Sequence, residues 1–195
     1  MANLHAIHSV GNSLMTYLRN AYPADLQQDF PCEFRLVASG EMNGDKVDFG
    51  TAVTLYLYRV TVNPYLRNTP HVNALQQTST PLSVDLSYLL TFWADSALAE
   101  QTILGWVIRQ LYVHQTLSPS DLTPDGGWEP GDVVQVIPSE ISNEDLMRIW
   151  DALDPGYRLS ISYIARVVRI DADVPPDAQP VVAKSLRFTS GGGVR

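Results

Sequence analysis

Hydrophobic and polar residues alternate along three long stretches of the chain, and this two-residue period predicts three β-strands. In residues 157–171 the alternation holds up to Tyr163, and from Ile164 onward apolar residues stand on both faces. The second half of this strand is therefore expected to be covered on both sides, which places it near the middle of a sheet. Residues 51–62 and 82–93 are rich in β-branched and aromatic side chains and predict its neighbours.

A spacing of three or four residues between apolar positions predicts three helices. Residues 3–20 carry one apolar stripe, and residues 143–153 follow Ser142, a capping residue with Asp145 three positions on. Residues 97–115 are apolar nearly all round, which predicts a helix buried on two sides. That leaves two alternatives for this helix, a central position in the domain or a face covered by another subunit.

Together these elements predict an α+β domain with a mixed, largely antiparallel β-sheet and about three helices packed on it. Shorter strands are expected at residues 32–38 and 133–137, and one more at residues 181–188, at an edge of the sheet. The single domain is expected to span residues 1–188, and the glycine-rich residues 189–195 are expected to form a flexible tail.

Length and charge narrow the range of possible functions. At 195 residues the chain is long enough to bury a core without disulfides or metals. Its formal net charge of −8 argues against nonspecific nucleic-acid binding, which depends on neutralising phosphates. The sequence shows neither a secretory signal at its start nor an apolar run of membrane-spanning length. These features favour the cytoplasm and no direct membrane insertion.

Candidate chemistry is sparse. Cys32 lies among strand-like residues and is interpreted as a buried, inert thiol. His5 and His8, three apart on a predicted helix, lack further ligands at zinc spacing and are interpreted as structural. The glycines of residues 118–131 match no phosphate-binding motif and predict turns around an isolated Trp128. No nucleophile motif is present. We therefore expect no enzyme, no cofactor and no metal.

One face of a predicted strand leaves a second function open. In residues 51–62, Tyr56 and Tyr58 make the face opposite the apolar one aromatic, and it is either covered by a helix or presented to a partner. The long connection of residues 63–81 has no periodic pattern, which is typical of functional or solvated loops. A small-molecule-binding or enzymatic domain that uses this aromatic face is therefore the alternative.

The order of several segments resembles the N-terminal domain of cap, or tube-terminator, proteins of phage-tail-like contractile injection systems. No single motif is diagnostic, and the resemblance rests on the order in which these segments follow one another from about Met1 to Asp171. The segments are LHAIHSVGNSLMTYLRNAYP, LYLYRVTVNPYLRN, PLSVDLSYLLTFWAD, ILGWVIRQLYVHQTL, IPSEISNEDLMRIWDAL and YRLSISYIARVVRID.

The resemblance implies a structural protein with a phage tail-terminator-like fold. Such caps form a hexameric ring on the last ring of the inner tube, stop tube growth and bind the top of the sheath. The implied partners are further copies of the chain, the inner tube protein and the sheath protein, in a particle assembled in the cytoplasm and released from the cell. The candidate interface residues are Arg59, Asn63, Arg67, Asn68, Trp106 and Tyr112.

Overall fold

The computed structural model describes residues 2–43, 48–66, 71–72, 78–79, 81–153 and 156–171. The strand expected at residues 181–188 and the tail at 189–195 lie outside these residues, as do Arg67 and Asn68.

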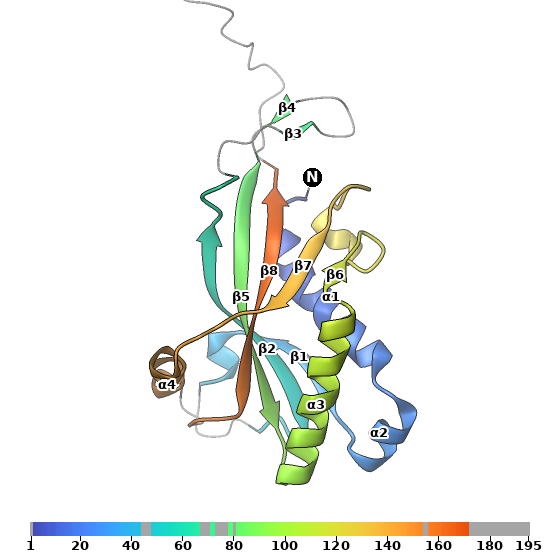
Figure 1. Cartoon of the computed structure of the whole chain (residues 1–195), viewed down its shortest axis with the longest axis vertical. Helices are drawn as coiled ribbons and strands as arrows, with labels where there is room; N and C mark the ends of the chain where they lie inside the picture. Colours follow the sequence, from blue (N-terminus) through green and yellow to red (C-terminus); the bar gives the residue numbers. More distant parts are fainter. Residues whose placement is uncertain are drawn as a thin grey trace, which may run out of the picture.

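A six-stranded sheet in the order β1-β2-β5-β8-β7-β6 forms the centre of the molecule (Figure 1). Only the β1–β2 pair is parallel, and the other pairs are antiparallel. The strand predicted to lie near the middle, β8, does so, and the α+β class is confirmed. A separate two-stranded sheet pairs β3 with β4. The strands are β1 (Glu33–Val37), β2 (Ala52–Val62), β3 (His71–Val72), β4 (Thr78–Ser79), β5 (Leu82–Trp93), β6 (Thr116–Leu117), β7 (Val134–Pro138) and β8 (Ser160–Ile170).

Helices cover the two faces of the sheet unequally. Helices α1 and α3 pack on one face, and α4 packs on the lower part of the other face in the view of Figure 1. The helices are α1 (Ala6–Ala21), α2 (Ala24–Asp29), α3 (Ala97–Val113) and α4 (Asn143–Asp151), with short 3₁₀ turns η1 (Ser39–Glu41) and η2 (Pro124–Gly126). The three predicted helices are confirmed, and α2 was not predicted. Within the described residues, no helix combines the length and apolarity that a membrane span requires.

The alternation along β5 produces two hydrophobic clusters. Leu90 and Phe92 face α1 and α3, whereas Leu89 and Trp93 face α4. Trp93 is 4% exposed, and its indole Nε1 donates a hydrogen bond to Thr54 Oγ1 at 2.9 Å. Because the indole N–H of Trp93 has a hydrogen-bond partner, this side chain adds no unsatisfied donor to the second cluster.

Serine side chains fasten the loop that carries Trp128 to α1. Trp128 Nε1 donates to Ser9 Oγ at 2.9 Å, and Ser9 Oγ lies 2.7 Å from Thr123 Oγ1. The backbone N–H of Thr123 donates to Ser13 Oγ at 2.7 Å. The predicted turns are confirmed by η2 and by Gly127, whose φ is +67°. The isolated tryptophan is therefore a structural anchor for the loop.

Candidate interaction surfaces

One side of α3 is packed into the core. Its buried residues are Ile103, Trp106, Val107 and Leu111. Trp106 is 5% exposed, and its ring lies edge-on to Tyr22 at a centroid distance of 4.9 Å. In the isolated chain this predicted interface residue therefore belongs to the core. Little of its side chain remains for a partner.

The opposite side of α3 is exposed, and most of its side chains are apolar. Leu98, Tyr112 and Val113 are 69%, 74% and 65% exposed, and Ile108 lies between them at 37%. A Cβ built on Gly105, on the same side, meets nothing within 4 Å. We call these five residues the outer face of α3. The sequence left two positions for this helix, one central in the domain and one with a face covered by another subunit. The central position is wrong, because one side of α3 is exposed to solvent.

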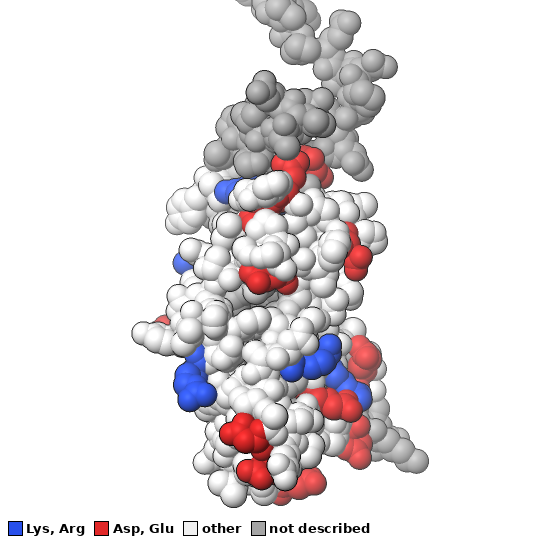
Figure 2. Space-filling model, turned by 90° about the vertical axis from the view of Figure 1, so that its right-hand side faces the viewer, with Lys and Arg blue, Asp and Glu red and all other residues white. Residues whose placement is uncertain are grey.

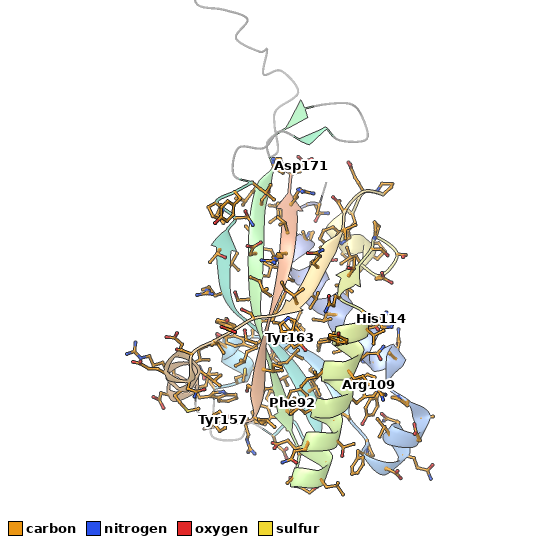
Figure 3. The ribbon with its side chains drawn as sticks, viewed as in Figure 1. Phe92, Arg109, His114, Tyr157, Tyr163 and Asp171 are labelled. Carbon is orange, nitrogen blue, oxygen red and sulfur yellow. The ribbon has the colours of Figure 1, made fainter. Side chains whose placement is uncertain are left out.

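The charge distribution supports an interaction role for this side of the molecule. Figure 2 shows the side of the molecule that carries α3, and most of its surface belongs to uncharged residues. Arg109 and His114 lie on and next to α3 in Figure 3, and both residues are exposed. Grouped exposed apolar side chains mark protein interfaces more often than free surface. The outer face of α3 is therefore a candidate contact with another protein.

The polar candidates at the end of β2 have different environments. Asn63 is buried, its Nδ2 lies 3.1 Å from Asp85 Oδ2, and its Oδ1 accepts the backbone N–H of Tyr65 at 3.1 Å. It therefore holds the turn after β2 in place. Arg59 is exposed, and its guanidinium lies 5.9 Å from the centre of the Tyr58 ring.

β2 also has an unpaired edge, which sequence reasoning missed. β1 pairs only with residues 52–56 of β2, so among the described residues nothing pairs with that side of residues 57–62, which we call the open edge. Val60 and Val62 are 45% and 51% exposed. The signal in the sequence was the unequal length of the strands predicted at 32–38 and 51–62.

A hollow of about 590 Å³ lies where β1 ends, next to the open edge. Leu4, just before α1, and Ile7, in its first turn, line one side, and Leu57 and Tyr88 line the other from the sheet. Leu4 is 79% exposed at its rim. The hollow therefore offers apolar contacts to a side chain that arrives along the edge of β2.

A cleft of about 620 Å³ separates α4 from the aromatic face of β2. Tyr56, Tyr58 and Arg59 line one side, and Arg148 and Ile149 line the other. The Tyr58 hydroxyl is already 3.1 Å from Ser162 Oγ. The aromatic face is thus partly covered by a helix and partly open, between the two alternatives that the sequence left.

The described residues hold no group of side chains suited to a metal ion. Among them, no three His, Cys, Asp or Glu side chains lie close enough to hold a metal ion. Cys32 is buried, as predicted, and burial raises the pKa of its thiol to about 12. The reactive thiolate is therefore disfavoured at neutral pH.

The comparisons with known proteins agree with the fold. No curated protein matches the sequence. The chain is similar to a solved structure described as the sheath/tube terminator of the extracellular contractile injection system PVC in its extended state, with 22% identity and a TM-score of 0.57. That match covers 97% of this chain and 65% of the other. The chain is also similar to the tube-terminating cap of the anti-feeding prophage, with 20% identity and a TM-score of 0.53 over 93% of this chain and 59% of that one.

The resemblance seen in the sequence is thereby confirmed at the level of fold, and the chain spans less than two thirds of either longer relative. A family model described as the Pvc16 N-terminal domain matches residues 9–184, which is most of the chain. This protein therefore belongs to the Pvc16 N-terminal domain family.

Proposed function

We propose that this protein is the structural cap of a contractile injection system. The observation that carries the proposal is its family membership together with its similarity to two solved tube terminators. In this role six copies form a ring on the last ring of the inner tube, end tube growth and anchor the top of the sheath. The function is assembly, and the protein catalyses no reaction.

The outer face of α3 is the proposed contact between neighbouring copies in the ring. A closed ring needs a head-to-tail interface in which two different patches of each subunit meet. The exposed Leu98 and Tyr112 supply apolar area on one patch, and an apolar interface core is typical of permanent assemblies. The adjoining patch on the next copy is expected to bury them.

Arg59 is the described candidate for contact with the tube or the sheath. Its exposed guanidinium can bind a carboxylate through paired hydrogen bonds. Arg67 and Asn68 follow in the same family-like segment and are proposed to extend this contact. The net charge of −8 makes protein partners more suitable than nucleic acid. Assembly is expected in the cytoplasm, within a particle that is later released.

Electron microscopy of particles from cells that lack this chain tests the proposal. We expect tubes of uncontrolled length, uncapped ends and sheaths that contract spontaneously. Re-expression of the chain should restore uniform, extended particles. Particles of normal length with extended sheaths, produced without the chain, would refute the cap function.

The cleft between α4 and the aromatic face of β2 favours one rival, a small-molecule-binding or enzymatic domain. Its volume of about 620 Å³ is within the usual range for ligand pockets. A ligand that binds only the folded state raises apparent stability. A metabolite that raises the thermal midpoint of a monomeric chain, and no longer does so after Tyr56→Ala, would support this rival over the cap.

A further inference from the structure

A hollow of about 460 Å³ lies on the face of the sheet that carries α4, near the ends of β2 and β8. Helix α4 covers only the lower part of that face in the view of Figure 1. Arg166 and Arg169 of β8 line the hollow, and its described lining contains no aspartate or glutamate. We call it the arginine hollow.

An irregularity in the pairing of β8 brings the two arginines to the same hollow. On a regular strand, residues three apart point to opposite faces of the sheet. Here the register between β8 and β5 shifts by one residue between Ala165 and Val168, both of which are buried on the α1 side. β8 thus places two residues opposite one of β5, as in a β-bulge. Bulges often re-aim a side chain beside a functional site.

The turn after β2 adds apolar surface to the arginine hollow. Asn63 Oδ1 accepts the backbone N–H of Tyr65 at 3.1 Å and that of Leu66 at 3.3 Å, which holds this turn in place. Tyr65 is 91% exposed, and Val133, just before β7, is 47% exposed. These apolar and aromatic residues line the same hollow as the arginines. The site therefore combines two cations with apolar contacts.

The arginine hollow is a locally positive site on an acidic chain. Arg166 is exposed and Arg169 is half-buried. One carboxylate lies near them in the sheet, because Asp85 of β5 is opposite the bulge. That carboxylate already accepts from Asn63 Nδ2 at 3.1 Å. Two guanidinium groups beside one engaged carboxylate leave an excess of positive charge, whereas the whole chain carries −8.

We propose that the arginine hollow binds an acidic segment of a protein partner. A carboxylate of the partner lies between Arg166 and Arg169 and accepts charge-assisted hydrogen bonds from both. An apolar side chain next to it packs against Tyr65 and Val133. Nucleic acid suits the site less well, because the net charge of −8 repels phosphates. The hollow lies on the sheet face opposite α3, and the inference does not depend on the cap function.

NMR titration of the full-length chain with two blocked peptides tests the proposal. The first is acetyl-Asp-Leu-Asp-Phe-Asp-amide, and the second has asparagine at each aspartate. We expect the acidic peptide to shift the Nε–H signals of Arg166 and Arg169 and the backbone amide signal of Val133. The asparagine peptide should leave these signals in place. Sodium chloride at about 0.3 M should weaken binding of the acidic peptide, because it screens exposed charges.

Single substitutions separate the site from net charge. Arg166→Gln and Arg169→Gln each remove one positive charge, and Arg109→Gln on α3 is the matched control at another exposed arginine. We expect each hollow variant to weaken binding of the acidic peptide by about threefold or more, and the double variant by about tenfold or more. The control should change it by less than about twofold.

Equal weakening by Arg109→Gln would overturn the proposal, because net charge alone would then explain binding. Equal binding of the two peptides, or no shift of the arginine signals, would also overturn it. A DNA oligonucleotide that binds more tightly than the acidic peptide, and only when both arginines are present, would assign the hollow to nucleic acid instead. A lower urea midpoint in the double variant would mean that the arginines serve the fold, whereas an unchanged midpoint with lost binding supports the proposal.

Discussion

At the residue scale, Ser9 joins two segments that are far apart in sequence. Its Oγ accepts from Trp128 Nε1 at 2.9 Å and contacts Thr123 Oγ1 at 2.7 Å. Ser9→Ala leaves these partly buried groups without that partner. We expect the free energy of unfolding to fall by about 2 kcal/mol. Urea denaturation measures the change.

Ser120→Ala is the control, because Ser120 is exposed and, among the described residues, its hydroxyl contacts Ser118 Oγ at 2.7 Å. It should change stability by less than about 0.5 kcal/mol. Equal losses in the two variants would contradict a special role for Ser9.

Cys32 makes stability depend on alkaline pH. In the folded chain burial raises the pKa of its thiol to about 12, from 9.0 when freely solvated. Above pH 9 the unfolded chain therefore binds fewer protons than the folded chain, so stability is full below pH 9 and falls as pH rises toward 12. Cys32→Ala should flatten this fall. The measurement is the urea midpoint of both chains at pH 8 and pH 10.

The flattening should be partial, because burial also raises the pKa of Tyr22 to about 12. Tyr22→Phe added to Cys32→Ala should flatten the profile further. Identical slopes for wild type and Cys32→Ala would show that the thiol titrates alike in both states.

At the scale of elements, the outer face of α3 is the part with the clearest consequence for assembly. Tyr112 is 74% exposed, so Tyr112→Asp should leave the fold intact. A carboxylate buried in a subunit contact is strongly unfavourable. We therefore expect self-association to weaken by at least about tenfold. Analytical ultracentrifugation measures it.

Met147→Asp is the control, since Met147 is also an exposed apolar residue on a helix, at 40% exposure, but lies on α4. It should leave association unchanged. Equal weakening by both variants would mean that general surface charge is responsible.

Gly105 tests how closely a partner approaches α3. A glycine inside an exposed helix costs about 1 kcal/mol relative to alanine, and a Cβ here meets nothing in the isolated chain. Gly105→Ala should therefore raise the free energy of unfolding of the monomer by about 1 kcal/mol. If neighbouring backbones pack closely at this point, the same variant should weaken association. A stabilised monomer with unchanged association would place the close contact elsewhere on the helix.

The sequence predicted elements better than their pairing. The alternation in β8 and the apolar stripe of α1 gave the correct strand and helix, because each pattern reflects burial of one face. The short α2 was missed because it has no buried residue and so no stripe. The outer face of α3 was left as one of two alternatives, since periodicity shows that a surface is apolar but not what covers it.

Interface candidates were predicted less well than the fold. Trp106 and Asn63 were selected by residue type and by position in the family-like segment. Burial of the first and the hydrogen bonds of the second depend on Tyr22 and Asp85, which come from other elements. Such long-range contacts have no local signal. The open edge of β2 likewise arises from pairing with a shorter strand.

At the scale of the whole molecule, net charge should control formation of the proposed ring. Each chain carries a formal charge of −8, so the six chains of the proposed ring would together carry −48 (six times −8). Like charges on neighbouring copies repel, and salt screens them over a Debye length of about 10 Å at 0.1 M. The residues of the outer face of α3 are apolar, so the proposed contact through them would be little weakened by salt.

We therefore expect association to strengthen as sodium chloride rises from about 0.02 M to 0.3 M, because repulsion is screened while apolar contacts persist. Sedimentation at matched protein concentrations measures the association. In Tyr112→Asp, added salt should restore little of the lost association. Association that weakens steadily with salt would instead mean that ion pairs hold the copies together. Arg59 and Arg109, exposed cations on an acidic chain, would then replace the outer face of α3 as the first positions to change.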